Sequence, residues 1–523
     1  MTALELVLAP DDAARVPRLK FLAGLKAGRL RRRAIEIVWH DTADGALALE
    51  GLALAESRGT WRLERLVPGT AFWPPGAPAP LVEQHAALDR TGHELPAGLV
   101  RTARFAGELT ILPLVHDGAH LTLELLHGTV GWARKRRPAC RMTLVAAAPV
   151  AHAGVGAPVV GEASTGDAGT ADAGLGDPAV AAEAAVFALA QALADELDLA
   201  VPTASLAAEA RAVATASVAA VRHEGAPHLP PGLTVAEAFA FVLGHLADVI
   251  LYNAPLAAAG RDGPEPVHEM RVAVRRLRSA IALFRPVVGC PEVDAAAAGL
   301  KALADRLGPA RDWDVFVAET AAAVGKVLPD DASLRRLRAA AERRRRQAYA
   351  ALRDWLGRVE FRRLGLALAG LAGGRAWQAA LDPEQAETLG LSLEAFASRA
   401  LARRLHRLAA AGEAIEHLDP KALHAIRLRA KRMRYVAEVF APLYPGKATR
   451  RFMRRLARLQ DRLGRLNDSS VADALLAEMG AGTGGRGHAA GLVRGFLAAG
   501  SRGARGRIAR AWARFHRLEP FWS

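Results

Sequence analysis

Two stretches of the sequence carry basic residues at the spacing of one helix face. In residues 267–286, VHEMRVAVRRLRSAIALFRP, these residues are His268, Arg271, Arg275 and Arg278. At about 100° per residue they fall within roughly 80° of one face, beside an apolar stripe. Cationic groups held this close repel one another unless negative charge offsets the repulsion. The pattern therefore predicts a helix that binds an anion or pairs with acidic neighbours.

The second stretch, LHAIRLRAKRMRYVAEVFAP at residues 423–442, aligns with the first at an offset of 156 without a gap. Its aligned basic residues are His424, Arg427, Lys431 and Arg434. The same register continues into residues 305–315 and 461–471, where Asp312 recurs as Asp468. A register held this long predicts two copies of one helical unit that face each other about a pseudo-twofold axis.

Acidic neighbours are the simpler explanation for one basic helix, since Glu269 or Asp305 could pair with it. Glu269 aligns with Ala425, however, so the repeat favours an external anion. Arg276 and Arg432 lie about 100° off their stripes and are expected at the rim of the site. We interpret the two recurring aspartates as N-caps of the helix that follows.

Length and composition predict a folded chain of two to four domains, at roughly 100 to 200 residues each. With 51% hydrophobic and 24% charged residues among 523, disorder as the dominant state is excluded. Residues 1–231 hold 21 basic and 25 acidic side chains, net −4, whereas residues 232–523 hold 48 and 29, net +19. The C-terminal part alone therefore indicates either a polyanionic partner or a solvated basic surface.

Alternation of apolar and polar residues predicts antiparallel strands up to about residue 147, for example at 34–42, 59–67, 108–115 and 120–133. The basic run at 134–137 is expected in an exposed loop. Residues 152–178, rich in Gly, Ala and Asp, predict a mobile insertion, and a helix is expected from 179 to about 198. From residue 232 to the end the period is helical. Cys140 and Cys290 form no metal-ligand pattern and are expected to be buried thiols.

The paired HxxRxxxRxxR and HxxRxxxKxxR helices, each followed by a leucine–glycine turn and an aspartate, resemble the CHAD domain, the conserved histidine α-helical domain. The resemblance covers residues 232–523. It implies two pseudo-symmetric four-helix bundles whose basic residues line a central channel that binds inorganic polyphosphate. Carried over position by position, the ligands would be the eight residues of the two stripes, with Arg276 and Arg432 at the rim.

Residues 1–221 resemble, in the order of their segments, a CYTH domain, the triphosphate tunnel fold that often precedes a CHAD domain. That family holds divalent metal with alternating acids inside an antiparallel β tunnel. The matching positions here are Ala3, Glu5 and Val7 on the first strand and Arg141, Thr143 and Val145 on the closing strand. The lost carboxylates are the ligands that Mg²⁺ or Mn²⁺ needs, so the resemblance implies a degenerate domain without the family's catalysis.

The sequence thus predicts an α+β protein of two domains, an antiparallel β tunnel or barrel at 1–221 and an all-α domain at 232–523. The predicted function is polyphosphate binding in the cytoplasm, in association with polyphosphate granules. No catalytic residue, metal or cofactor is expected. Neither a membrane nor a sequence-specific nucleic acid is expected as a partner. No apolar run reaches the length of a membrane helix, and no signal peptide is found. Two alternatives stay open. One is a triphosphatase that depends on Mg²⁺ or Mn²⁺, and the other is a non-specific nucleic-acid binder, which the few aromatic residues beside the stripes disfavour. Oligomeric state, polyphosphate length preference and the role of the N-terminal domain are not set by the sequence.

Overall fold

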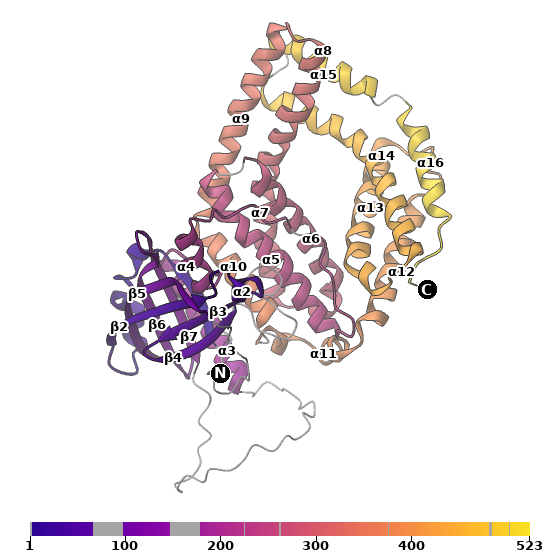
Figure 1. Ribbon diagram of the computed structural model, residues 1–523. Helices are drawn as coiled ribbons and strands as arrows, with labels where there is room; N and C mark the ends of the chain where they lie inside the picture. The colour runs from indigo at the N-terminus through magenta and orange to yellow at the C-terminus, as the bar shows by residue number, and fades with distance from the viewer. Residues whose placement is uncertain are drawn as a thin grey trace. The chain divides into compact units, whose positions relative to one another are not determined.

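The computed structural model describes residues 3–65, 98–146, 178–223, 225–260, 263–374, 376–480, 484–500 and 503–522 (Figure 1). Contacts within the chain divide it into a sheet unit, Met1–Ala220 with Arg362–Leu381, and a helical unit, Val221–Phe361 with Asp382–Ser523. The segment Arg362–Leu381 therefore belongs with the sheet, whereas the sequence analysis assigned it to the helical domain. The predicted insertion at 152–178 lies outside the described residues, except for Pro178, where a helix begins.

One antiparallel sheet of eight strands forms the first unit, in the order β4-β3-β2-β5-β6-β7-β1-β8. The strands are β1 Ala3–Leu8, β2 Arg31–Asp41, β3 Leu52–Ser57, β4 Thr60–Arg65, β5 Val100–His116, β6 Ala119–Trp132, β7 Lys135–Ala146 and β8 Leu199–Ala200. Within the described residues the pairings run from β4 to β8 and do not close the predicted tunnel. The basic run expected in a loop instead continues into β7, because Lys135 to Arg137 pair with the end of β6.

Helices pack on this sheet from several segments of the chain. They are α1 Lys20–Leu25, α2 Ala46–Leu49, α3 Pro178–Glu196 and α4 Leu206–Thr215, and most of α10, Val359–Gly373, belongs to the same unit through its contacts with α3. Ala207 and Ala210 of α4 join an apolar cluster with Trp39 and Phe105 of the sheet. α3 packs on β1, β6 and β7. On α10, Arg363 forms an ion pair of 2.7 Å with Asp195 of α3.

The helical unit contains the same three-helix succession twice. Its helices are α5 Val235–Ala259, α6 Glu265–Val288, α7 Pro291–Val315, α8 Ala322–Val327, α9 Ala332–Leu356, α11 Pro383–Gly390, α12 Leu393–Ala411, α13 Pro420–Phe440, α14 Lys447–Glu478, α15 Gly484–Gly500 and α16 Ala504–His516. A π-helical turn, Phe316–Ala321, joins α7 to α8. The succession α5–α6–α7 recurs as α12–α13–α14, and α7 and α14 begin 156 positions apart, at the offset of the sequence repeat.

Apolar clusters join the two copies at both ends. At one end Phe284 of α6 contacts its aligned residue Phe440 of α13, with ring centroids 6.3 Å apart, and Phe396 of α12 contacts both rings. At the other end the buried residues of α7 and α9 form one cluster with those of α14 and α15. The space between these clusters is where the basic faces of α6 and α13 meet.

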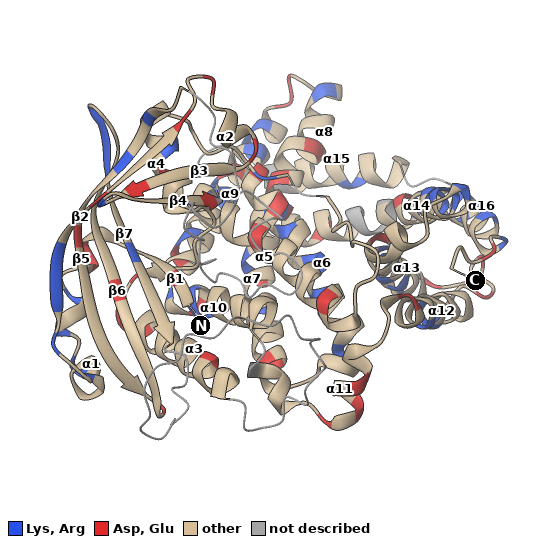
Figure 2. Cartoon of the chain, turned by 60° about the horizontal axis from the view of Figure 1, so that its bottom comes forward, with Lys and Arg blue, Asp and Glu red and all other residues tan. Residues whose placement is uncertain are grey.

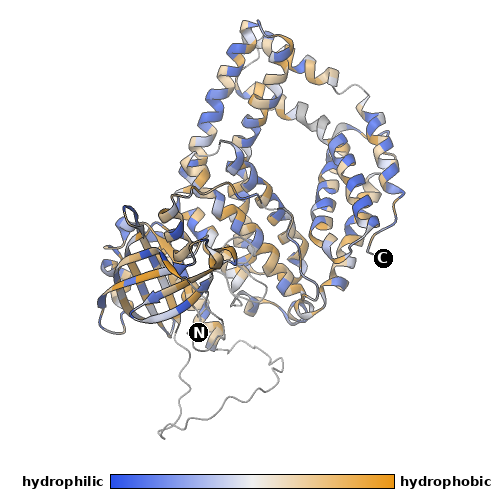
Figure 3. Cartoon of the chain, viewed as in Figure 1, coloured by the Kyte–Doolittle hydropathy of each residue, from blue (hydrophilic) through white to orange (hydrophobic). Residues whose placement is uncertain are grey.

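Two helices correct the expectation that no segment could span a membrane. By length and composition alone, α3 and α5 are both long and apolar enough to do so. α5, drawn mostly in orange in Figure 3, has 72% of its apolar window buried within the protein. Its start is fixed by a capping box, in which Thr234 and Glu237 satisfy each other's backbone N–H. Burial of this kind is typical of the core helix of a folded domain.

Candidate functional site

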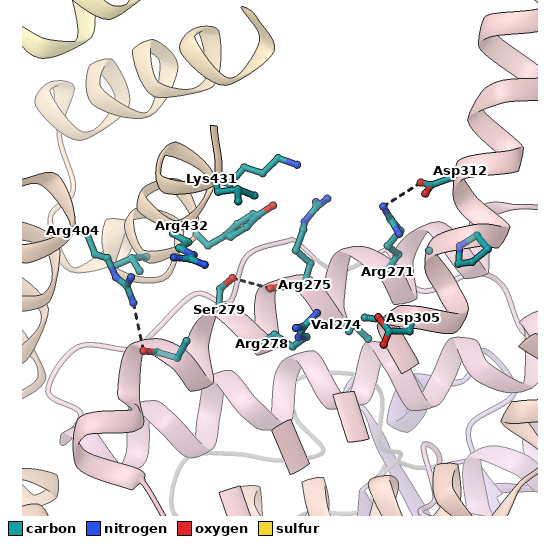
Figure 4. Close-up of a pocket in the computed structure, with 17 residues that line it drawn as sticks. Arg271, Val274, Arg275, Arg278, Ser279, Asp305, Asp312, Arg404, Lys431 and Arg432 are labelled. Carbon is teal, nitrogen blue, oxygen red and sulfur yellow. Dashed lines mark hydrogen bonds and ion pairs between the residues drawn. The ribbon is translucent and has the colours of Figure 1, made fainter. Parts of the chain in front are cut away.

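Two adjoining cavities lie between the copies of the helical repeat. The large cavity, of about 870 Å³, is lined by residues of α6, α7, α12 and α13 (Figure 4). The small cavity, of about 370 Å³, is lined by residues of α6, α13 and α14. Arg275, Lys431 and Tyr435 line both cavities, so the cavities adjoin at these three side chains.

The two cavities are related by the internal repeat. At the offset of 156, the large-cavity residues Arg271, Arg278, Asp305 and Gly308 align with the small-cavity residues Arg427, Arg434, Asp461 and Gly464. Arg275 aligns with Lys431, and these two lie where the cavities meet. Equivalent residues meet each other only near the axis that relates two copies. The pseudo-twofold axis therefore passes close to Arg275 and Lys431.

Eight of the ten residues predicted for the site line these cavities. Those at the large cavity are Arg271, Arg275, Arg278, Lys431 and Arg432, and those at the small cavity are Arg275, Arg276, Arg427, Lys431 and Arg434. His268 and His424 line neither. Arg276 and Arg432, expected at the rim, each line a cavity. Both line a cavity because α6 and α13 face each other. A side chain that lies outside the basic stripe of its own helix can therefore still reach the space beside the opposite helix.

Positive charge dominates the large cavity. Six cationic side chains line it, against the carboxylates of Asp305 and Asp312, which leaves four positive charges in excess. Arg404 of α12 is the cation that the sequence analysis missed; one of its nitrogens lies 3.5 Å from the carbonyl oxygen of Ala282. Burial lowers the pKa of Arg404, and the neighbouring arginines, Arg432 among them, lower it further. A side chain whose charged form is disfavoured in this way gains from a bound anion.

Asp312 holds Arg271 in the large cavity and is not an N-cap. Asp312 lies inside α7, and its Oδ1 accepts a hydrogen bond from Arg271 Nη2 at 3.3 Å (Figure 4). Burial raises the pKa of Asp312, and the charge of Arg271 opposes that shift. The expected leucine–glycine turn is likewise continuous helix, and a Cβ on Gly308 would lie 3.2 Å from Arg271 Nη1. Asp468 falls inside α14, and its side chain lies outside the described residues.

Glu438 makes the small cavity unlike the large one. Its Oε1 accepts a hydrogen bond from Arg434 Nε at 2.6 Å, and its Oε2 lies 3.5 Å from Arg276 Nε on the other copy. The aligned residue at the large cavity is Ala282, which brings no charge. Five cations and two carboxylates therefore line the small cavity, with three positive charges in excess.

Tyr435 is a further residue that the sequence analysis overlooked. The guanidinium of Arg275 lies 5.3 Å from the centroid of the Tyr435 ring, which is a cation–π distance. Burial raises the pKa of this phenol, whereas the charge of Arg275 lowers it. Tyr435 and Glu438 follow Lys431 and Arg434 by four positions each, so helical spacing could have placed both beside the basic stripe.

In the sheet unit, the positions that the resemblance to a CYTH domain assigned to a metal site lie on paired strands. In the pairing of β1 with β7, Glu5 stands opposite Thr143 and Val7 opposite Arg141. Arg141 is buried; its Nη2 lies 2.7 Å from Glu209 Oε2, and its Nη1 lies 3.5 Å from Glu5 Oε1. Burial raises the pKa of Glu5. A guanidinium held between two carboxylates repels a divalent cation at this place.

One other group in the described part of the chain has the composition of a metal site. His223 Nδ1 lies 3.3 Å from Glu269 Oε1 and 3.8 Å from Glu265 Oε1. Neither a metal site nor a partner for Glu269 outside the basic stripe was expected from the sequence. Glu269 is instead within hydrogen-bonding distance of His223.

The helical unit is a duplicated helical module whose basic cavities lie about a pseudo-twofold axis, and this places it in the class of helical domains built from an internal repeat. A family model for the CHAD domain matches residues 241–477. The crystal structure of the CHAD domain from the plant Ricinus communis is 32% identical, covers 57% of this chain and 98% of its own, and superposes with a TM-score of 0.49. PptA from Streptomyces chartreusis is 18% identical over 54% of this chain and 99% of its own, with a TM-score of 0.42. No curated protein matches. The chain belongs to the CHAD family, and its helical unit carries the CHAD domain.

Proposed function

We propose that this protein binds inorganic polyphosphate in the large and small cavities of its CHAD domain, a family linked to polyphosphate binding. The observation that carries the proposal is the set of six cationic side chains, from both copies of the repeat, around one cavity of about 870 Å³. Arginine forks bind phosphate oxygens in pairs, and lysine adds a point charge. A polymer with one charge per phosphate can occupy such a site in any register.

The sheet unit is proposed to be a degenerate tunnel domain that does not hydrolyse triphosphate. Support comes from the buried ion pairs of Arg141 with Glu5 and Glu209, which stand where that chemistry needs free carboxylates. The apolar cluster of α4 with the sheet also leaves less room on that face. Full-length protein given triphosphate with Mg²⁺ or Mn²⁺ is expected to release no phosphate above background. Metal-dependent turnover that an Arg141 variant abolishes would contradict this.

Calorimetry with the full-length protein tests the binding proposal. We expect saturable binding of long-chain polyphosphate that weakens steeply with salt, because bound counterions are released from the polymer. The full chain is needed because a fragment from residue 232 would remove α3 from its partner α10. A single-stranded nucleic acid of equal charge should compete poorly, since few aromatic side chains line the cavities to stack its bases. Equal competition would favour the nucleic-acid alternative, and no binding of polyphosphate would refute the proposal.

A further inference from the structure

A third basic cavity, of about 410 Å³, lies between α14 and α16, and we call it the α14–α16 groove. Three arginines from each helix line it: Arg455, Arg458, Arg462, Arg507, Arg510 and Arg514. Asp461 is the one carboxylate in the lining, so five positive charges are in excess. Figure 2 shows blue gathered along α14 and α16.

The same local pattern builds both walls of this groove. On α14 each arginine directly precedes a buried leucine; these leucines are Leu456, Leu459 and Leu463. On α16, Arg507 precedes buried Ile508 and Arg514 precedes buried Phe515. Neighbouring residues are about 100° apart around a helix, so each basic stripe runs beside an apolar one. Phe515 packs on Phe452 of α14 with ring centroids 5.2 Å apart, and this packing brings the basic stripes together.

Carboxylates do not explain why these arginines gather. Within the described ranges, Arg455, Arg458 and Arg510 form no ion pair with an acidic residue. Arg510 is exposed, and it lines the groove together with the arginines of α14. Such an arrangement costs electrostatic free energy unless an anion offsets the repulsion.

The internal repeat does not account for most of the arginines on the α14 wall of the groove. Where α14 carries Arg455 and Arg458, the aligned positions of α7 are Gly299 and Ala302. Arg462 is the one α14 arginine of the groove with a basic counterpart on α7, Arg306. Two of the three arginines on the α14 wall are therefore particular to the second copy and need an explanation beyond the paired cavities.

The α14–α16 groove shares one lining residue with the small cavity. Asp461 lines both the small cavity and the α14–α16 groove, and Arg275 and Lys431 join the small cavity to the large one. We infer that the groove holds a further segment of the same polyphosphate chain, so that one long chain runs through all three. This inference rests on the proposed function. A flexible polymer with a charge on every phosphate suits arginine-lined surfaces in succession.

The test compares two triple variants of the full-length protein with equal loss of charge. One removes the α16 wall: Arg507→Gln, Arg510→Gln and Arg514→Gln. The control removes three exposed arginines of α9 that line none of the three cavities: Arg338→Gln, Arg343→Gln and Arg346→Gln. Calorimetry measures long-chain polyphosphate and tripolyphosphate on each, and thermal unfolding checks the fold. If the α16 variant does not fold, Arg455→Gln with Arg458→Gln on α14 replaces it.

For the α16 variant we expect the Kd of long-chain polyphosphate to rise at least about tenfold while that of tripolyphosphate stays unchanged. The plot of log K against log salt should lose about 2 units of slope, at roughly 0.7 per lost phosphate contact. The control should keep the wild-type slope. Equal effects of the two variants on long chains, or an equal loss for tripolyphosphate, would overturn the inference while leaving the proposed function intact. If wild-type protein binds no polyphosphate, the proposed function itself fails.

Discussion

Replacing Arg275 or Lys431 by glutamine should weaken polyphosphate binding by similar factors. These aligned residues come from opposite copies of the repeat, and both line both cavities. Each loses one charge-assisted contact to phosphate, worth roughly 1.5 to 3 kcal/mol. At about 1.4 kcal/mol per factor of ten, the Kd should rise about ten- to a hundredfold in either variant. The slope of log K against log salt should fall by about 0.7 in each.

The fold should survive both changes. Arg275 is exposed, and its contact with Tyr435 is a cation–π interaction worth about 0.5 to 1 kcal/mol at such a site. Calorimetry of the full-length variants at two salt concentrations measures the effect, with thermal unfolding as the check on the fold. Arg338→Gln on α9 is the matched control for loss of one charge. If one variant weakens binding and the other matches the control, the cavities do not share a ligand and the pseudo-symmetry of the site has no role in binding.

Further expectations follow from single contacts. Glu438→Gln removes the carboxylate that two arginines share. Calorimetry should then show tighter polyphosphate binding, and the free energy of unfolding in urea should fall by about 1 to 2 kcal/mol. Weaker polyphosphate binding would contradict this. Gly308→Ala should weaken polyphosphate binding, because the added methyl group displaces Arg271. The midpoint of urea unfolding should not fall, because alanine exceeds glycine in helix propensity by about 1 kcal/mol. Unchanged polyphosphate binding would show that Arg271 is not held in its binding position. Burial raises the pKa of the Cys140 thiol to about 12 and that of the Cys290 thiol to about 11. Both thiols should therefore stay protonated at mildly alkaline pH, and mass spectrometry should find iodoacetamide adducts only after the protein is unfolded. Rapid labelling of the native protein would refute their burial.

The sequence was most informative where a periodic pattern decides the structure. The repeat register foretold that α6 and α13 are equivalent, and alternation foretold the strands of the sheet. One helix wheel could not tell which neighbouring face meets the partner helix, so it did not show that Arg276 and Arg432 each line a cavity. Arg404 was missed because α12 reaches the cavity only through tertiary packing. Asp312 was misread as a cap because Leu307 and Gly308, which resemble a turn, continue α7 as helix.

The sheet unit takes its last segment, Arg362–Leu381, from beyond the whole first copy of the helical repeat. During synthesis, domains usually fold in order from the N-terminus as the chain leaves the ribosome. Here the earlier unit stays unfinished until residue 381 has emerged, after α5 to α9 are already available to fold. Until then the surface of α3 that meets α10, where Phe187 packs against Gly370, remains open. The sheet unit therefore begins first on the ribosome, but it cannot be completed until the whole first copy of the helical repeat has been synthesised.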